Sequence, residues 1–243
     1  MTAHLESVEL LEGPTHAGIV LTCEHASNAL PAPWTWPEHD RWLVDTHWAY
    51  DLGIADVTRE LARELELPAV LSRYSRLLCD VNRPADADTT FRPFADGHPV
   101  WLNQALTDAE RQARIDALHA PFHSAVDHLV ERTPRAAVLS MHSFTPIYEA
   151  GPPRWMEIGV LFDRDEALAH RVAEALEREG WRVALNEPYS GRLGLIYSAA
   201  RHAERHGRAA LELEVRNDVA TDLGRRSTLL HGLRHALGHA GLC

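Results

Sequence analysis

The stretch AAVLSMHSF, residues 136–144, predicts a buried strand over residues 136–141 that is followed by the polar residues His142 and Ser143. Its first six residues form a short apolar run of the kind found in strands covered on both faces. Upstream, apolar residues recur at spacings of three and four over residues 107–132, which indicates an amphipathic helix. Thr107 and Glu110 form a capping-box pattern at the start of that helix. Downstream, a second apolar run occupies residues 158–162.

The same alternation extends over the rest of the chain. Strand-like runs occupy residues 17–23, 69–72, 136–141, 158–162, 182–185 and 209–215. Helical patterns occupy residues 45–65, 107–132, 164–179, 195–206 and 222–239, with Gly180 and Gly207 as expected C-caps. Strands that alternate with helices predict a mostly parallel, mixed sheet covered on both faces. We therefore expect one three-layer α/β/α domain over residues 1–243.

Composition excludes several classes of function. The net charge of −11 comes from 35 acidic and 24 basic residues and argues against a general nucleic-acid binder. All the basic residues are arginines, which excludes a Schiff-base lysine and a P-loop lysine. No apolar run approaches the roughly 20 residues of a membrane helix, and no secretory leader pattern is visible. Three scattered cysteines, Cys23, Cys79 and Cys243, suit the reducing cytoplasm rather than a disulfide scaffold.

Two histidines follow predicted strands and are candidate metal ligands. His25 comes after the first strand and His142 after the third. Imidazoles at neighbouring strand ends can converge on one zinc ion, which in catalytic sites takes three protein ligands. The third ligand stays open among Glu24, Asn28 and the more distant Asp45 and Asp51. The alternative is that one or both histidines are structural.

Glu214 is the candidate general base. Apolar and polar residues alternate along residues 211–216, and Glu214 lies near the end of that strand. A carboxylate in a buried sheet is costly unless it is paired or functional, and one placed there can take the proton of an attacking water. The alternative is an edge strand whose charges are solvated.

Arginines cluster after the second strand. Arg73, Arg76 and Arg83 lie within eleven residues, with Asn82 beside Arg83. A planar guanidinium suits bidentate recognition of a carboxylate, so the cluster favours an anionic substrate over ordinary surface charge. The loop over residues 84–102 is long for a compact domain and is expected to form a wall of the pocket.

These motifs together resemble the N-formylglutamate amidohydrolase family. The resemblance lies in CEHASNALP, LVDTHWAYDLGIA, SRLLCDVNRP, SMHSF, NEPYSG and LELEVRND, in that order along the chain. More distantly, the strand-end residues are similar to those of zinc carboxypeptidases, which implies a related phosphorylase/hydrolase-like fold. The carboxypeptidase pattern His-x-x-Glu is not kept, because its last position is Asn28 here.

The resemblance implies a set of roles. One zinc ion is expected on His25 and His142, with Asp45 as third ligand and Asn28 or Glu24 as the other options. Glu214 is expected to act as base and Arg76 to stabilise the oxyanion. Substrate is expected to bind to Asn82, Arg83 and Arg216.

We therefore expect a cytoplasmic, zinc-dependent amidohydrolase. Its expected substrate is a small anionic N-acyl amino acid, with N-formylglutamate foremost, and neither nucleic acid nor membrane is an expected partner. Two alternatives stay open: a related zinc hydrolase for another amide or peptide, and a metal-free binding protein. The sequence predicts no oligomeric state.

Overall fold

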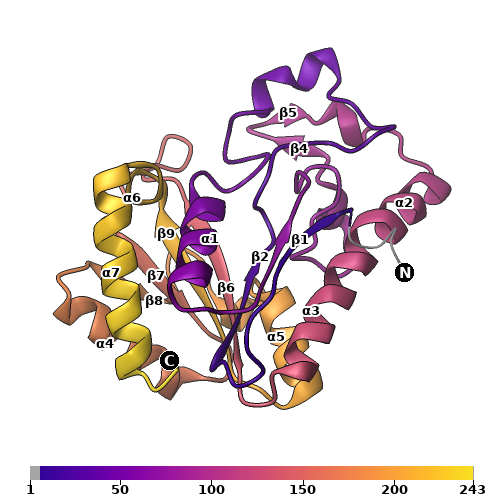
Figure 1. Cartoon of the computed structure of the whole chain (residues 1–243). Helices are drawn as coiled ribbons and strands as arrows, with labels where there is room; N and C mark the ends of the chain where they lie inside the picture. Colours follow the sequence, from indigo (N-terminus) through magenta and orange to yellow (C-terminus); the bar gives the residue numbers. More distant parts are fainter. Residues whose placement is uncertain (1–5, 243) are drawn as a thin grey trace.

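A seven-stranded sheet organises the computed structural model, which describes residues 6–242 (Figure 1). The strand order across the sheet is β1-β3-β2-β6-β9-β7-β8. The strands are β1 (Val8–Leu11), β2 (Ile19–Cys23), β3 (Ala69–Ser72), β6 (Ala137–Phe144), β7 (Ile158–Leu161), β8 (Val183–Leu185) and β9 (Ala210–Arg216). Every residue of β2, β3, β6, β7 and β9 is buried, as expected for strands covered on both faces.

The sheet is mostly parallel and mixed, as predicted. Strands β3, β2, β6 and β9 pair in parallel, and β7 pairs in parallel with β8. Two pairs are antiparallel: β1 with β3, and β7 with β9. The sequence did not predict β1, because its four residues, VELL, include a charge and only Val8 is fully buried. Pairing with β3 at the sheet edge, rather than a pattern of its own, holds β1 in place.

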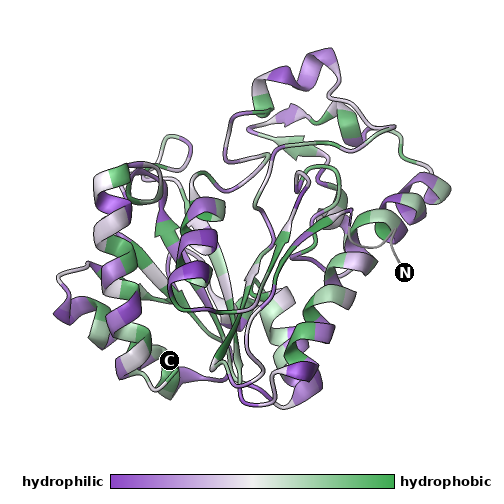
Figure 2. Ribbon diagram, in the orientation of Figure 1, coloured by the Kyte–Doolittle hydropathy of each residue, from purple (hydrophilic) through white to green (hydrophobic). Residues whose placement is uncertain are grey.

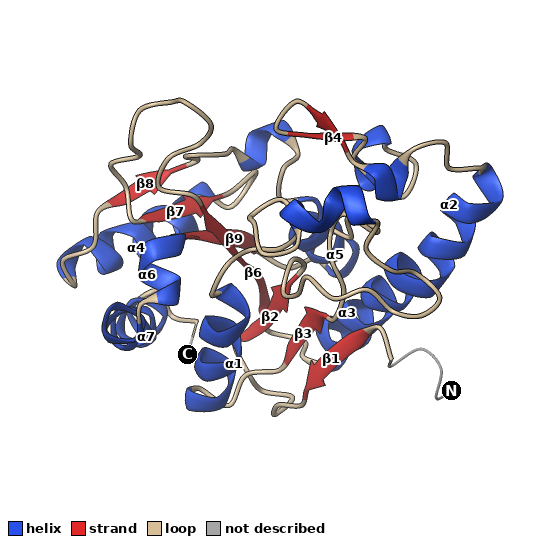
Figure 3. Cartoon of the chain, turned by 90° about the horizontal axis from the view of Figure 1, so that it is seen from above, coloured by secondary structure: helices blue, strands red, loops and turns tan. Residues whose placement is uncertain are grey.

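Helices cover both faces of the sheet, which confirms the three-layer architecture (Figures 1 and 3). Leu21 of β2 belongs to the core cluster that also contains Leu61 of α1, whereas its neighbour Val20 belongs to the opposite cluster with Val126 of α3. Figure 2 shows green, hydrophobic strands between helices whose outer faces are purple. One layer contains α1 (Ile54–Glu64), α4 (Glu166–Arg178), α6 (Asn217–Thr221) and α7 (Leu223–His239); the other contains α3 (Ala120–Arg132) and α5 (Tyr197–His206).

Two predicted helices differ from the observed ones. The helix expected over residues 45–65 begins only at Ile54, because residues 45–53 form turns that end at Gly53, whose φ is 78°. The helix expected over residues 107–132 consists of α2 (Asp108–Arg114), a π-helical segment (Ile115–His119) and α3. Its start is as predicted, since Thr107 and Glu110 form both hydrogen bonds of a capping box.

A cap covers the carboxyl ends of the strands. It is built from residues 38–50 and 88–103, which include η2 (Glu38–Leu43), η3 (Asp88–Phe91), the hairpin of β4 (Phe94–Ala95) and β5 (His98–Pro99), and η4 (Trp101–Asn103), and lies at the top of Figure 1. Asp40 joins the two segments, because its buried carboxylate accepts hydrogen bonds from the backbone of Trp101 (2.9 Å) and Leu102 (2.7 Å). Across residues 6–242, no helix combines the length and the apolar character that crossing a bilayer requires.

Candidate active site at the carboxyl ends of the central strands

A pocket of about 310 Å³ opens where β2, β6 and β9 end. The three strands are neighbours in the sheet, so the residues at their carboxyl ends meet at one edge. The register pairs His142 of β6 with Glu214 of β9. The pocket is lined by His25, His47, Trp48, Asp51, Arg76, Asn82, Arg83, Arg92, His142, Ser143, Phe144, Thr145, Tyr148, Tyr189, Leu195, Glu212 and Glu214.

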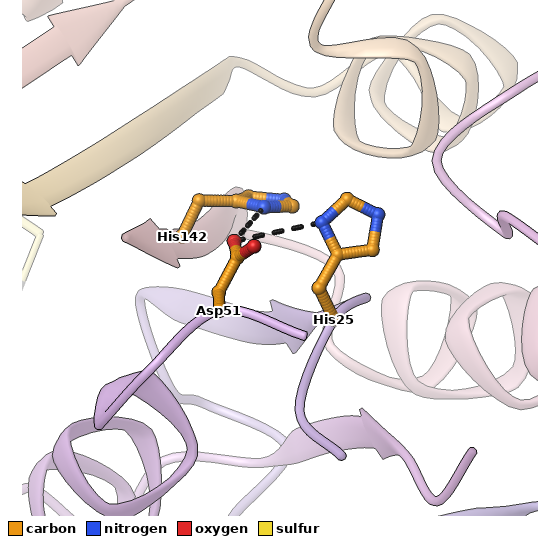
Figure 4. Close-up of side chains that lie close together, drawn as sticks. All are labelled: His25, Asp51 and His142. Atoms are coloured by element: carbon orange, nitrogen blue, oxygen red, sulfur yellow. Dashed lines mark hydrogen bonds and ion pairs between the residues drawn. The ribbon is translucent and has the colours of Figure 1, made fainter. Parts of the chain in front are cut away.

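Two histidines and an aspartate converge at the floor of this pocket (Figure 4). Oδ2 of Asp51 lies 2.8 Å from Nδ1 of His142 and 3.5 Å from Nδ1 of His25. All three side chains are buried, and the two imidazole rings meet edge to face with centroids 4.6 Å apart. Asp51 reaches this position because its backbone N–H donates to the carbonyl of His25 (2.9 Å), which fixes the turn before α1.

Each histidine contacts a second buried carboxylate through its other ring nitrogen. Nε2 of His25 lies 2.8 Å from Oδ1 of Asp80, and Nε2 of His142 lies 3.1 Å from Oε2 of Glu24. In a neutral ring, a hydrogen bond donated by Nε2 to its carboxylate leaves Nδ1 with a lone pair that faces Asp51. Histidines that ligate metals are oriented by carboxylates in the same way.

The donor set fits a divalent cation. Nδ1 of His25 is buried and has no hydrogen-bond partner among the described residues. Two imidazole lone pairs and a carboxylate oxygen that face one another, all within 4.8 Å, need a positive charge between them. Nitrogen and oxygen donors of this kind are the ligands of catalytic zinc, which would be held by His25, Asp51 and His142.

The carboxyl groups that contact the two histidines have strongly lowered pKa values. Burial alone would raise the pKa of Glu24, but hydrogen bonds from His142 and Ser140 outweigh it and lower this pKa to about 2. Burial likewise opposes ionisation of Asp80, yet His25 and Arg76 hold its pKa well below the usual range. Both carboxylates therefore stay ionised and can accept hydrogen bonds from the histidines.

Two further carboxyl groups have pKa values shifted the other way. Burial raises the pKa of Glu212 to about 7 and that of Glu214 well above its ordinary value. Within residues 6–242, Oε2 of Glu214 has no hydrogen-bond partner although it is buried. Strand β9 lies between β6 and β7, so the alternative of an edge strand with solvated charges is wrong. Glu214 thus presents a carboxyl group to the pocket that can hold or release a proton.

Arginines line the side of the pocket beneath the cap. Arg76 lies 3.0 Å from Asp80 and 3.4 Å from Asp51, and so supports the groups that hold the histidines. Arg83 lies at the pocket with its guanidinium anchored on the carbonyl of Asn82 (2.7 Å). Arg92, which the sequence did not single out, belongs to the cap and lines the same pocket.

Comparison with known proteins agrees with this geometry. The model of the N-formylglutamate amidohydrolase family matches residues 17–220, a span that contains every residue of the pocket. The chain belongs to this family.

Solved structures show the same fold. The gene product Atu2144 from Agrobacterium tumefaciens is 30% identical, with a TM-score of 0.88 and coverage of 99% of this chain and 96% of that one. The N-formylglutamate amidohydrolase from Ralstonia eutropha JMP134 is 21% identical, with a TM-score of 0.68 and coverage of 96% and 98%. A search of curated protein sequences gave no match.

For this member of the N-formylglutamate amidohydrolase family, the structure brings together many of the expected site residues. His25, His142, Glu214, Arg76 and Arg83 all line the pocket. Asn82 does too, although its amide is occupied by the carbonyl of Leu195 and the backbone N–H of Ser198.

Other expected residues lie elsewhere. Asp45 is exposed and accepts a hydrogen bond from Asn28 (3.2 Å), and neither residue lines the pocket. Glu24 lies behind His142, where it accepts from the ring rather than facing both histidines. Arg216 does not line the pocket either, because Asp218 (2.7 Å) and the carbonyl of Met156 (3.1 Å) occupy its guanidinium.

Sequence reasoning missed the aromatic wall. Trp48, Tyr148 and Tyr189 line the pocket, and Arg154 stacks on both tyrosine rings. For two of them the signal was present in the family motifs, since Trp48 lies in LVDTHWAYDLGIA and Tyr189 in NEPYSG; Tyr148 lies in no motif. These residues belong to loops, where no periodicity indicates which side chain faces a ligand.

Proposed function

We propose that the protein is a zinc-dependent amidohydrolase that removes the acyl group from a small anionic N-acyl amino acid, with N-formylglutamate as the leading substrate. The observation that carries this proposal is the convergence of His25, Asp51 and His142 beside the unpartnered carboxyl group of Glu214. Family membership supports the amidohydrolase class. Similarity to a solved N-formylglutamate amidohydrolase supports the substrate.

We assign the third metal ligand to Asp51 rather than to Asp45. Asp51 is buried and its Oδ2 faces both Nδ1 atoms, whereas Asp45 is exposed. A zinc ion held by His25, Asp51 and His142 would polarise an acyl oxygen and lower the pKa of water. Asp80 and Glu24 keep the two ligating rings in the tautomer that leaves Nδ1 free.

Glu214 is the group that moves the proton. Its partner-free Oε2 can take a proton from water as the nucleophile attacks and return it to the departing amine nitrogen. Arg76 lines the pocket while it pairs with Asp51 and Asp80, and guanidinium has five N–H donors, so a donor remains for the oxyanion that develops.

Two arginines suit the two carboxylates of an N-acyl glutamate. Arg83 is held by the carbonyl of Asn82 and can grip the α-carboxylate bidentately. Arg92, on the cap, can bind the side-chain carboxylate. With the substrate held at both ends, the amide bond is oriented relative to the histidines, which lowers the entropic part of the barrier.

Formate release from N-formyl-L-glutamate tests this proposal. We expect turnover by the purified protein, loss of turnover after treatment with a chelator, and recovery when Zn²⁺ is added. His142→Ala should be inactive, whereas His128→Ala, an exposed histidine of α3 outside the pocket, should be fully active. Turnover that survives chelation would contradict metal dependence. Release of an acyl group from another N-acyl amino acid, with no formate from N-formyl-L-glutamate, would reject N-formylglutamate as the substrate but keep the amidohydrolase class.

One observation favours a metal-free binding protein instead. A proton shared between Nδ1 of His142 and Oδ2 of Asp51, which are 2.8 Å apart, would satisfy both atoms without a metal. The pKa of His142 agrees with this: burial lowers it, but Glu212, Asp51 and Glu24 outweigh burial and raise it well above its ordinary value. A protein that binds N-formylglutamate, holds no metal on His142 and releases no formate would establish this alternative.

A further inference from the structure

A second cluster of ligand groups lies on the helical layer, outside the pocket. His231 and His235 are one turn apart on α7, and their rings tilt toward each other with centroids 4.4 Å apart. Glu179, the residue that ends α4, approaches them from the neighbouring helix, with Oε1 3.7 Å from Nδ1 of His235. One ligand atom from each of the three residues lies within 4.8 Å of the others. None of the three lines the active-site pocket.

The spacing of these groups suits a metal ion. Two histidines at positions i and i+4 of a helix present both imidazoles on one face, an arrangement that binds zinc. Bonds of about 2.0–2.2 Å in a tetrahedral site place ligand atoms roughly 3.4 Å apart. The side chains of Glu179 and His235 are 28% and 38% exposed, so they can rotate to close the remaining distance.

Backbone packing brings the carboxylate to the histidines. Gly232, next to His231, is buried in α7, although glycine is less favourable than alanine inside a helix. A Cβ at this position would lie 2.6 Å from the indole nitrogen of Trp181 and 3.6 Å from the Cβ of Glu179. The missing side chain therefore lets the end of α4 approach α7 closely enough for Glu179 to reach the histidines.

Helix electrostatics also favours a cation here. Glu179 is the C-cap of α4, and His235 lies in the last turns of α7, which ends at His239. Carbonyl groups at the end of a helix carry partial negative charge, which attracts cations. Exposed groups at such a place can bind a metal ion with little desolvation cost.

We propose that Glu179, His231 and His235 form a second metal site, which takes a divalent transition metal such as Zn²⁺ and joins the end of α4 to α7. Imidazole and carboxylate donors suit Zn²⁺ and Ni²⁺ rather than Mg²⁺ or Ca²⁺. Because the ion ties two helices of the folded chain, it stabilises the native state according to its concentration. The proposal is independent of the active-site metal and of the proposed substrate.

The experiment compares Zn²⁺ binding by the intact protein and by three variants. After chelation and dialysis against Zn²⁺, elemental analysis should give about one ion per chain fewer in His231→Ala/His235→Ala than in the parent. His142→Ala should retain this second ion. His128→Ala, which removes an exposed histidine from α3, should retain the parent's zinc content. Equal zinc content in the parent and the double variant would overturn the proposal, and so would equal loss in His128→Ala.

Thermal unfolding supplies a second readout. Zn²⁺ at about 100 times its dissociation constant should raise Tm by on the order of 5 °C more in the parent than in the double variant. Glu179→Gln keeps both histidines but removes the carboxylate charge, so it should weaken Zn²⁺ binding at this site about tenfold without abolishing it. Unchanged affinity in Glu179→Gln would show that the two helices are not joined by the ion.

Discussion

Nε2 of His25 lies 2.8 Å from Oδ1 of Asp80, although 55 residues separate them along the chain. Asp80 also accepts hydrogen bonds from Arg76 (3.0 Å) and from the backbone of Asn82 (2.9 Å). Its position is therefore fixed before any ligand binds, and it fixes the tautomer of His25 in turn.

Asp80→Asn should consequently weaken metal binding without removing a ligand. A neutral amide at position 80 polarises the His25 ring less than a carboxylate does, so the ring becomes a weaker electron-pair donor to the metal. Changes of this kind to a residue that contacts a ligand cost about 10–100-fold in metal affinity. Competition with a zinc-binding dye, using protein that carries His231→Ala/His235→Ala, measures the active-site ion alone. Equal zinc affinities with and without the Asp80→Asn substitution would show that Asp80 does not support metal binding.

The choice between two aspartates is tested by a matched pair of variants. Asp51→Asn removes the carboxylate that faces both Nδ1 atoms, so it should abolish stoichiometric zinc binding at this site. Asp45→Asn changes an exposed carboxylate outside the pocket and should leave zinc content unchanged. The reverse result would restore Asp45 as the ligand.

Sequence alone could not have distinguished Asp45 from Asp51. Both lie in one motif, and the apolar spacing predicted a single helix through residues 45–65 that would contain both aspartates. In the structure residues 45–53 form turns, and a hydrogen bond from Asp51 to the carbonyl of His25 directs its side chain inward. Turns depend on long-range partners of this kind, which periodicity does not contain.

Central strands were predicted better, because their signal is local. The predicted strand 69–72 has the bounds of β3, and the strands that hold His142 and Glu214 were located to within a few residues. Arg216 shows the limit of this approach. Alternation along β9 put it on the face of Glu214, but Asp218, two residues on, pairs with its guanidinium and keeps it out of the pocket.

Glu214→Gln should separate catalysis from binding. The amide cannot take up a proton, and loss of a positioned base typically costs about 10²–10⁴-fold in kcat. Zinc content and the dissociation constant of N-formylglutamate should change little, because Gln keeps the shape of the side chain. A variant with near-normal kcat would make Glu214 a structural residue.

A buried histidine pair outside the pocket should make stability depend on pH. His123 is 3% exposed, and its Nδ1 lies 2.8 Å from Nε2 of His202, whose own Nδ1 contacts Asp127. Burial lowers the pKa of His123, and the nearby His119 and His202 lower it further. The unfolded chain therefore binds a proton below about pH 6.5 that the folded chain does not bind, so the free energy of unfolding falls as the pH falls.

Urea unfolding at pH 7.5, 6.5 and 5.5 measures this effect. Below pH 6.5 the contribution of His123 approaches about 1.4 kcal/mol for each pH unit. His123→Leu should flatten the dependence by about that amount, even though it destabilises the protein at every pH by leaving Nε2 of His202 without its partner. His128→Leu, at an exposed position, should keep the slope of the parent. Parallel curves for parent and His123→Leu would show that the pKa of His123 is the same in the folded and unfolded chains, and would contradict the prediction.

Arg83→Lys tests whether the pocket recognises a carboxylate. A guanidinium makes two parallel charge-assisted hydrogen bonds to a carboxylate, and an ammonium group cannot reproduce them. Loss of a hydrogen bond to a charged group costs about 1.5–3 kcal/mol, so kcat/KM for N-formylglutamate should fall about 10–100-fold although charge is conserved. N-formylglutamine α-amide, which lacks both carboxylates, should be a poor substrate for the parent and lose little more in the variant.

Arg73→Lys is the matched control, because Arg73 belongs to the same cluster but is exposed and donates to the carbonyl of Val8 (2.7 Å). Arg73→Lys should leave kcat/KM for both substrates unchanged. Equal losses on the two substrates in Arg83→Lys would mean that Arg83 supports the loop through the carbonyl of Asn82, and that the anion is recognised elsewhere in the pocket, with Arg92 the next arginine to substitute.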